Sequence, residues 1–348
     1  MRIAMDTREA HSPHPTGKGL FARNVLEELK KRGIAITEYS GGGGLRWHFA
    51  SARAVRVSSC DLYLSPTSFI VPWLLRKKIK TAIVIHDLIA FESSPHDRKA
   101  TLIERLLLPR ALKTATYIFC VSEATKKELL TKFPEVDNSK ISVIYEGSTL
   151  PSQPPYLLTP ASRSSQRSEG WSLLSNPYIL SIGTFSPRKN QLRLIQAFNT
   201  LPEELKKETK LILAGGRGWR DAEIIALAKH SPNVEWRGYV PADELTALLA
   251  NATILAYPSL KEGFGLPVLD AMTLGVPVLT SNMSSMKEIA GDAALLIDPM
   301  SVEEITEGLE KLLMESELRR EFIERGKGRA KEFSWGKTVD LILKAIEK

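Results

Sequence analysis

The sequence predicts an α/β protein with two doubly wound domains that face a central cleft. Strand-like apolar runs alternate with helical patterns along the whole chain, which is typical of parallel sheets covered by helices. A chain of 348 residues is also long for a single hydrophobic core. Between the two halves, residues 151–176 are rich in Ser and Pro and show no apolar period, which predicts a surface loop between domains.

Apolar runs that end at polar or turn-forming residues mark the expected strands. In the first half they cover 2–6, 60–65, 81–86, 116–122 and 141–145. In the second half they cover 178–183, 210–214, 234–236, 253–257, 278–280 and 294–297. Asp298 and Pro299 precede an apolar period over 302–314 and predict a helix start there. Residues 334–348 predict an amphipathic terminal helix.

Composition places the chain among ordinary globular proteins. Hydrophobic residues make up 43% of it and charged residues 25%. Cys60 and Cys120 lie beside or inside apolar runs, which predicts reduced core residues in a cytoplasmic protein. No apolar run is long enough to cross a bilayer, and residues 1–6 predict a strand and not a signal peptide.

The net charge of +7 is compatible with several kinds of partner. They are nucleic acid, an anionic membrane face and anionic substrates, and the alternative is a solvated basic surface with no specific partner. The sequence contains no nucleic-acid-binding motif and no regular interleaving of aromatic and basic residues. We therefore expect no nucleic-acid partner, and composition leaves the other interpretations open.

Residues 262–270 combine a carboxylate, a Gly-aromatic-Gly turn and a second carboxylate. The preceding stretch, 252–259, predicts a buried strand, and 266–274 has helical spacing of apolar residues, so Glu262 is placed in the loop and Asp270 on the helix. A strand, a Gly-rich loop and a helix offer backbone N–H groups to a bound anion. Two carboxylates beside them suit a ligand with phosphates and hydroxyls, such as a nucleotide sugar. The alternative is an acidic helix start with a solvated face.

Lys189 is the best candidate for stabilising a phosphate. It follows a strand and a turn and precedes a helical stretch that begins at Asn190, so a cation and a helix amino terminus would face one anion. Arg188 could add a planar donor fork. The alternative is that both residues cap a surface turn.

Two features of the first half are weaker signals. Gly17 and Gly19 precede a helix expected from Leu20, and such turns often bind nothing. His86 ends a strand at its carboxyl end, where ligands of open α/β sheets bind. It is either a hydrogen-bond donor to a sugar or a satisfied histidine at a strand end.

The stretch 262–270 resembles the E-x7-E signature of retaining glycosyltransferases of family 4, which have the GT-B fold of two Rossmann-like domains. Residues 179–190, 211–216, 234–240 and 285–299 follow the family pattern in order, and 85–88, 121–123 and 145–147 fit its looser marks. The form of 183–190 is most similar to mannosyl- and rhamnosyltransferases of surface-polysaccharide assembly. The resemblance implies a first domain over 1–165, completed by the helix over 334–348, and a second domain over 172–333.

The resemblance also implies the roles of individual residues. Lys189, Glu262, His86 and Arg188 form the implied catalytic set. The nucleotide-sugar donor would contact Gly17, Gly19, Gly183, Thr184, Gly215, Tyr239, Gly263, Phe264, Gly265, Leu266 and Asp270. Thr184 stands where the family usually has Arg, and Asp270 where it usually has Glu. The sequence has no Asp-x-Asp and no His/Cys cluster with ligand spacing, so we expect no metal and no cofactor besides the donor.

The implied activity is metal-independent transfer of a hexose, with mannose the first choice, to a glycan or a lipid-linked acceptor. GDP-mannose is the expected donor and a UDP-sugar the second choice. The alternatives are a nucleotide-sugar epimerase and a non-catalytic nucleotide-sugar-binding protein. A dinucleotide oxidoreductase is disfavoured because no Gly-x-Gly-x-x-Gly follows the first strand.

Two basic and apolar stretches of the first half suggest contact with a membrane. Trp73, Leu74 and Leu75 lie next to a basic run over 76–80, and residues 102–113 add an apolar stripe with Arg105, Arg110 and Lys113. Such a pattern suits reversible docking on the anionic inner face of the cell membrane. The alternative is a pair of helices packed on the sheet, with their charges in water.

Overall fold

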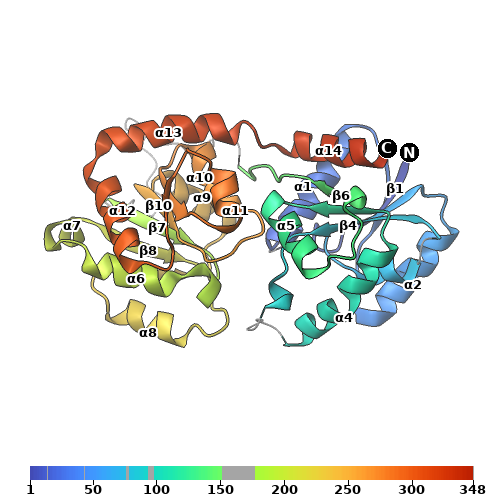
Figure 1. Ribbon diagram of the computed structural model, residues 1–348, viewed down its shortest axis with the longest axis horizontal. Coiled ribbons are helices and arrows are strands. Elements are labelled where there is room, and N and C mark those ends of the chain that lie inside the picture. The colour runs from blue at the N-terminus through green and yellow to red at the C-terminus, as the bar shows by residue number, and fades with distance from the viewer. Residues whose placement is uncertain (14, 43, 76–77, 93–97, 151–176, 348) are drawn as a thin grey trace. The chain divides into compact units, whose positions relative to one another are not determined.

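The computed structural model describes residues 1–13, 15–42, 44–75, 78–92, 98–150 and 177–347. The chain forms two compact units (Figure 1). The first unit consists of Met1–Thr149 with Phe333–Lys348, and the second of Leu150–Glu332. The linker expected over 151–176 lies outside the described residues.

The first unit is a parallel sheet in the order β2-β1-β3-β4-β5-β6. Its strands are β1 Arg2–Asp6, β2 Ala35–Tyr39, β3 Leu62–Ser65, β4 Lys80–Ile85, β5 Tyr117–Cys120 and β6 Ile141–Val143. Its helices are α1 Gly17–Lys31, α2 Gly44–Val57, α3 Ile70–Leu75, α4 Arg98–Thr114, α5 Glu123–Lys132 and α14 Trp335–Glu347, with short 3-10 turns at Ile89–Phe91 and Asn138–Lys140.

Strand β2 is absent from the sequence-based prediction. It runs along the edge of the sheet beside β1, and all its residues are partly or fully exposed. An edge strand with one bonded neighbour lacks the continuous apolar run that marks the central strands. All eleven predicted strands are present, with ends shifted by up to about two residues, the usual uncertainty of boundaries.

Helix α14 completes the first unit from the far end of the chain (Figure 1). It packs against α1, β5 and β6. The indole of Trp335 donates to the Ser148 carbonyl at 2.9 Å, and the Tyr117 hydroxyl donates to the Ile346 carbonyl at 3.0 Å. A side chain at Gly147 would lie 2.4 Å from the Trp335 nitrogen, so only glycine permits this close approach.

The second unit is a parallel sheet in the order β12-β11-β10-β7-β8-β9. Its strands are β7 Tyr178–Ile182, β8 Lys210–Ala214, β9 Val234–Gly238, β10 Ile254–Tyr257, β11 Val278–Ser281 and β12 Leu295–Ile297. Its helices are α6 Gln191–Thr200, α7 Glu203–Glu208, α8 Ala222–His230, α9 Ala242–Ala250, α10 Leu266–Leu274, α11 Ser284–Ala290, α12 Val302–Met314 and α13 Ser316–Ala330, with a 3-10 turn, η4, at Pro187–Lys189.

The strand order of each sheet contains a point at which the chain reverses its direction of winding. In the second unit β10 pairs with β7, with Ile254 beside Ile179, while β8 lies on the other side of β7. Ligands of open α/β sheets bind outside the carboxyl ends of the strands at this reversal. The loops that follow β7 and β10 are therefore neighbours at that edge.

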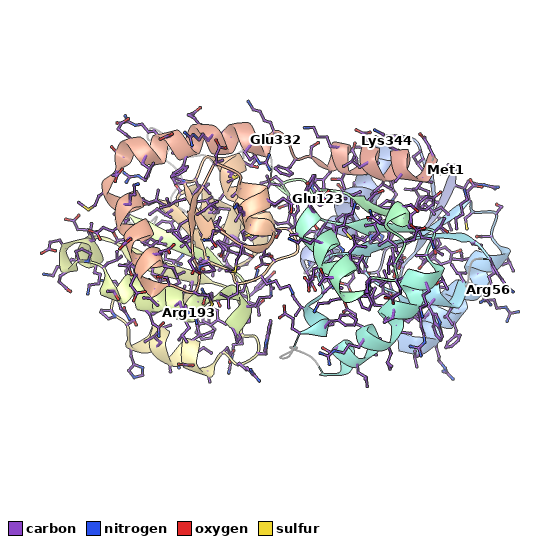
Figure 2. The ribbon with its side chains drawn as sticks, in the orientation of Figure 1. Met1, Arg56, Glu123, Arg193, Glu332 and Lys344 are labelled. Carbon is purple, nitrogen blue, oxygen red and sulfur yellow. The ribbon has the colours of Figure 1, made fainter. Side chains whose placement is uncertain are left out.

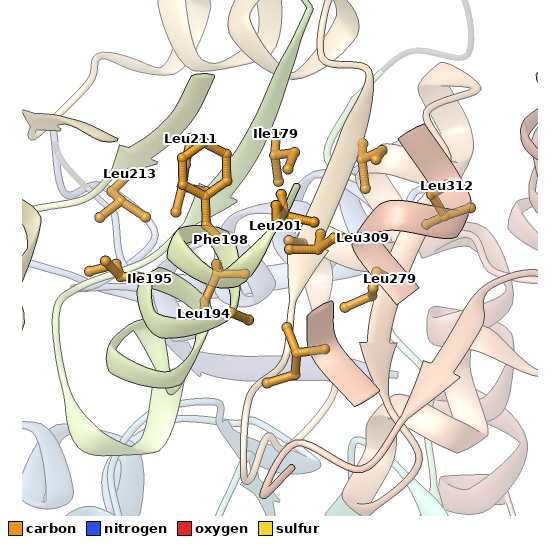
Figure 3. Close-up of a cluster of buried hydrophobic side chains, with 14 of the residues drawn as sticks. Ile179, Leu194, Ile195, Phe198, Leu201, Leu211, Leu213, Leu279, Leu309 and Leu312 are labelled. Carbon is orange, nitrogen blue, oxygen red and sulfur yellow. The ribbon is translucent and has the colours of Figure 1, made fainter. Parts of the chain in front are cut away.

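Apolar side chains of α6 and α12 form the core of the second unit against its sheet. Figure 3 shows Phe198 of α6 and Leu309 of α12 beside Ile179 and Leu211 of the central strands. All four are buried. Because this core fixes the helices that flank the sheet, it also fixes the loops that precede them. Charged side chains such as Arg56 and Lys344 project from the outer faces of α2 and α14 (Figure 2).

The structure divides the two stretches that suggested membrane contact. Leu75 is fully buried in the core of the first unit, and Trp73 and Leu74 are half-buried, so the apolar part of this stretch packs on the sheet. Arg76 and Lys77 lie outside the described residues. In contrast, the amino-terminal half of α4 exposes Leu102, Ile103 and Leu106. The apolar surface in this part of the first unit therefore comes from α4.

Candidate active site

The candidate site lies in the second unit, where the loops after β7 and β10 meet. Residues 187–189 form the turn η4, and the residue that follows, Asn190, adopts a left-handed conformation with φ of 62°. The sequence predicted that a helix starts at Asn190. Instead α6 starts at Gln191, and Asn190 is the corner between the two helical segments. This corner turns Arg188 and Lys189 toward the loop that carries Glu262.

Two cations hold the Glu262 carboxylate. The Lys189 ammonium donates to Oε1 at 2.6 Å, and the Arg188 guanidinium lies 2.5 Å from Oε2. Arg188 also donates to the Lys261 carbonyl at 2.6 Å. All three charged side chains are at most 18% exposed. Two positive groups and one negative group leave a net charge of one positive unit in a poorly hydrated place, which favours a bound anion.

Tyr257, the last residue of β10, contacts both Lys189 and Glu262. Its hydroxyl accepts a hydrogen bond from the Lys189 ammonium and donates to Glu262 Oε1 at 3.0 Å. The ammonium also lies 4.7 Å from the centre of the Tyr257 ring, within the range of a cation–π contact. Sequence inspection did not single out Tyr257. Its position at the carboxyl end of a predicted central strand, directly before Pro258, was the available signal.

The charges of the site decide which proton each group keeps. Burial opposes ionisation of Glu262, but Lys189 and Arg188 outweigh it and hold the pKa of this carboxyl at about 2. Burial, followed by the adjacent Glu262 charge, raises the pKa of Tyr257 well above its usual value. At neutral pH Glu262 is therefore a carboxylate that accepts hydrogen bonds, and Tyr257 is a neutral phenol that can donate one.

Helix α11 fixes the backbone of the Glu262 loop. The Glu262 N–H donates to the Ser284 hydroxyl at 3.2 Å, and the hydroxyls of Ser284 and Ser285 donate to its carbonyl, each at 2.9 Å. Gly265 then turns the chain into α10 with φ of 112°, and a Cβ there would lie 2.1 Å from the Met286 side chain. The positive φ favours glycine at this position, and the approach of this backbone to a ligand stays a prediction.

Asn190 is a second positioning residue that the sequence did not reveal. It is 2% exposed, and its side-chain amide donates to the carbonyls of Pro258 at 3.0 Å and Pro299 at 2.6 Å. These bonds tie the corner after β7 to the end of β10 and to the turn between β12 and α12. The amide thereby sets the distance between the Lys189 turn and the Glu262 loop.

Gly183 and Gly215 permit the close approach of the loops after β7 and β8. A Cβ at Gly215 would lie 2.0 Å from the Gly183 carbonyl oxygen, and Gly183 itself has φ of 135°. Thr184 is exposed and carries no charge to this part of the site. Tyr239 is also exposed, in the loop after β9. The structure thus gives Gly183 and Gly215 a packing role, and their contact with a donor stays a prediction.

The remaining predicted donor residues follow Glu262 in the chain. The Phe264 ring is buried, whereas Gly263 and Leu266 are partly exposed. Asp270 lies on α10, as predicted, and is partly exposed. The structure places these residues in the loop and helix that carry Glu262, and their contacts with a ligand stay predictions.

The glycines of the first unit do not form the expected loop. Helix α1 already begins at Gly17, capped by Thr16, whose hydroxyl accepts from the Gly19 N–H at 3.4 Å. A Cβ at Gly19 would lie 2.8 Å from the Glu9 carbonyl. The predicted helix start at Leu20 is therefore wrong by three residues, because Thr16 caps a helix that begins at Gly17. Gly19 serves the packing of that turn.

His86 follows β4 in the first unit, and both of its ring nitrogens have protein partners. Nε2 lies 2.9 Å from the Pro66 carbonyl oxygen, and Nδ1 lies 3.4 Å from a carboxylate oxygen of Glu146. His86 and Glu146 are both buried. Both partners are acceptors, and a neutral imidazole has a single N–H, so the tautomer of His86 decides to which of them it donates. The sequence missed Glu146 as the partner, and a sugar contact by His86 stays a prediction.

The described residues contain no group of three or more His, Cys, Asp or Glu side chains that could hold a metal ion.

Two family descriptions match the chain. "Glycosyltransferase Family 4" matches residues 15–149, and "Glycosyl transferases group 1" matches residues 165–329. The second match contains the turn with Lys189 and the loop with Glu262.

Individual proteins with curated names and solved structures are also similar. O-antigen chain mannosyltransferase B of Escherichia coli is 34% identical over 292 residues, covering 82% of this chain and 73% of that protein. Serotype-specific mannosyltransferase WbdA of Escherichia coli is 28% identical over 80% of this chain, but the match spans only 34% of WbdA. The structure of Anabaena HepE with UDP and glucose matches with a TM-score of 0.74 and 16% identity, covering 100% of this chain and 99% of HepE.

Proposed function

The chain is a glycosyltransferase of group 1 and family 4 with the GT-B fold, and from this premise we propose that it moves a mannosyl group from GDP-mannose to a glycan acceptor with retention of configuration. The names of two similar proteins, both mannosyltransferases, support mannose as the transferred sugar. A UDP-sugar is the second choice. A lipid-linked glycan is the acceptor class that we favour.

The observation that carries this proposal is the arrangement of Arg188 and Lys189 around Glu262 at the ends of β7 and β10. In the transfer, the bond between the sugar C1 and the diphosphate oxygen breaks, an acceptor hydroxyl oxygen bonds to C1, and the proton of that hydroxyl passes to the departing diphosphate. Negative charge therefore grows on the leaving diphosphate. Preorganised cations in a poorly hydrated site stabilise such charge more effectively than water does.

Each site residue then has a role in this reaction. Lys189 and Arg188 would bind the diphosphate, and Glu262 would accept hydrogen bonds from sugar hydroxyls. Asp270, on the helix that follows, would accept from the ribose. Because the two cations supply the positive charge that a divalent metal would otherwise supply, we propose that transfer needs no metal and no cofactor besides the donor.

A panel of ligands and one matched pair of variants test the proposal. Thermal-shift measurements with GDP, UDP, dTDP and their sugars should show the largest stabilisation with GDP-mannose. Lys189→Ala should lower turnover of that donor by at least about 100-fold, the scale of losing a charged transition-state donor. Lys206→Ala is the control, because Lys206 is a partly buried lysine of the same unit that pairs with Glu203.

Several results would contradict the assignment. Stabilisation by UDP-sugars alone would move the donor to the second choice. Near-normal turnover by a folded Lys189→Ala variant, equal to that of Lys206→Ala, would remove Lys189 from the reaction.

We propose further that the protein works in the cytoplasm and docks reversibly on the inner face of the cell membrane through α4. Its first turns expose Leu102 (59%), Leu106 (49%) and Ile103 (41%), and Arg105 and Arg110 lie on the same helix. No helix in the described ranges has the length and apolar character that a membrane span requires. Apolar side chains beside cations suit an anionic interface, where each Lys or Arg contributes about 1 kcal/mol.

Vesicle sedimentation tests this docking. The protein should sediment with phosphatidylglycerol-containing vesicles at low salt, and Leu102→Ser/Leu106→Ser should reduce the bound fraction. Leu341→Ser is the matched control, because Leu341 is an exposed leucine of α14 in the same unit. Equal recovery in the supernatant with anionic and neutral vesicles would reject membrane docking and favour a soluble acceptor.

A further inference from the structure

We propose that Tyr257 is a positioning residue for the transfer, whose hydroxyl holds Glu262 in place when Lys189 and Arg188 turn to the donor diphosphate. The inference rests on the proposed function, since it concerns the same cations and the same carboxylate. Tyr257 carries no charge itself, and its hydroxyl contacts both Lys189 and Glu262.

The position of Tyr257 is fixed independently of the charged groups. It is the last residue of β10, is 2% exposed, and its carbonyl accepts from the Thr280 hydroxyl of the neighbouring β11 at 2.8 Å. Its ring lies under the Lys189 ammonium. A side chain held by a central strand moves less than one on a surface turn. Tyr257 is therefore a fixed point against which Lys189 and Glu262 are placed.

The chemistry of the hydroxyl sets the direction of its hydrogen bonds. A phenol has one proton to donate, and the ammonium can only donate. The hydroxyl therefore accepts from Lys189 and gives its proton to Glu262 Oε1, which lies 3.0 Å away. In this state Oε1 has two donors, Tyr257 and Lys189, while Oε2 faces Arg188.

A bound diphosphate changes this balance, because it competes with Glu262 for the same cations. The charged groups that act on Glu262 are Lys189 and Arg188 from the turn η4, and α11 adds the hydroxyls of Ser284 and Ser285, which bond its backbone. Once the cations face the diphosphate, the hydroxyl of Tyr257 still donates to the carboxylate. Without it, a buried carboxylate takes up a proton more readily.

Removal of the hydroxyl should therefore act on the donor-bound state. Tyr257→Phe should lower kcat about 10-fold, the scale of losing a hydrogen bond to a charged group, with KM for the donor changed less than about threefold. The acidic limb of the kcat profile should move up by about one pH unit, because protonated Glu262 no longer accepts from the sugar.

Tyr178→Phe is the matched control for this experiment. Tyr178 is a buried tyrosine of the neighbouring strand β7, and its hydroxyl donates to the Leu248 carbonyl at 2.7 Å. Both substitutions remove a buried phenolic hydroxyl from the same sheet, and only the Tyr257 hydroxyl bonds charged side chains. A general loss of packing would lower activity equally in both variants and would leave the pH profile unmoved. That result would overturn the role of Tyr257.

A second measurement needs no turnover, so it separates this inference from the proposed function. Inorganic pyrophosphate is titrated into the wild type and both variants by calorimetry near pH 5, in buffers of different ionisation enthalpy. Proton uptake on binding should be larger for Tyr257→Phe than for the wild type and Tyr178→Phe. In Tyr257→Phe, Glu262 no longer accepts a hydrogen bond from the Tyr257 hydroxyl, so it takes up a proton more readily when pyrophosphate draws the cations away. Equal uptake in all three proteins would overturn the inference. If Tyr257→Phe shows the larger proton uptake but the wild type transfers no mannose, the proposed function fails, whereas the support of Glu262 by the Tyr257 hydroxyl stands.

Discussion

Glu262→Gln removes a negative charge that faces both Arg188 and Lys189. The carboxylate oxygens lie 2.5 Å from Arg188 and 2.6 Å from Lys189. At an effective dielectric constant of about 20, each pair gains about 6 kcal/mol of Coulomb energy. The cost of removing the ions from water offsets much of that gain. In Glu262→Gln the two cations face a neutral amide, so they lose the Coulomb attraction to the carboxylate but still lack the water that they gave up on folding.

The expected loss of unfolding free energy is about 3–5 kcal/mol, as for other buried pairs that lose one partner. For a unit of this size, such a loss lowers the melting temperature by roughly 10 °C. Inorganic pyrophosphate should restore part of it, because its charge replaces the carboxylate between the two cations. Glu262→Gln should therefore be stabilised more by pyrophosphate than the wild type, in which Glu262 competes for them.

Differential scanning fluorimetry with and without pyrophosphate measures both effects. Glu235→Gln is the control, since Glu235 pairs with Arg237 at 2.8 Å in the same unit but is 40% exposed. An exposed pair contributes less than about 1 kcal/mol, so this variant should melt near the wild type. The reasoning is refuted if both variants melt alike, or if pyrophosphate leaves the gap between Glu262→Gln and the wild type unchanged.

Three further predictions follow from the site and its surroundings. Asp270→Ala should weaken nucleotide binding about 10-fold while Asp270→Glu binds normally in a calorimetric titration, and the reverse order would remove Asp270 from the ribose. Transfer should persist in excess EDTA, and full loss that magnesium or manganese restores would contradict the metal-independent mechanism. Burial and the Arg8 charge lower the pKa of the buried His48 from 6.5 to about 4. Between these two pH values the unfolded chain binds a proton at His48 and the folded protein does not. The unfolding free energy should therefore fall as the pH drops from about 6.5 to 4. In denaturation experiments at a series of pH values, His48→Gln should abolish the loss of stability between about pH 6.5 and 4. The pKa of the Glu262 carboxyl is lowered from 4.5 to about 2, so the stability that it contributes is lost only as the pH falls below about 4.5.

Periodicity and turn chemistry in the sequence determine much of the fold. The central strands are buried on both faces, so they appear as continuous apolar runs, and β1 and β8 begin and end where the sequence indicates. The sequence pattern does not predict strand β2, because this strand lies at an edge of the sheet and its residues are partly or fully exposed. The start of α1 was misplaced because glycines in a first turn look like a loop, although Thr16 caps the helix.

The sequence also predicts the charged residues and glycines of the candidate site, since Lys189, Glu262 and their glycines stand in recognisable stretches. It does not predict which residues hydrogen-bond to them. Lys189 reaches Tyr257 across 68 residues of sequence, and the Asn190 amide reaches Pro299 across 109. Such bonds depend on the order of strands in the sheet, which local patterns do not specify. Only the tertiary structure places β10 beside β7, brings their two loops together, and so decides that Tyr257 and Asn190 hold the charged groups in position.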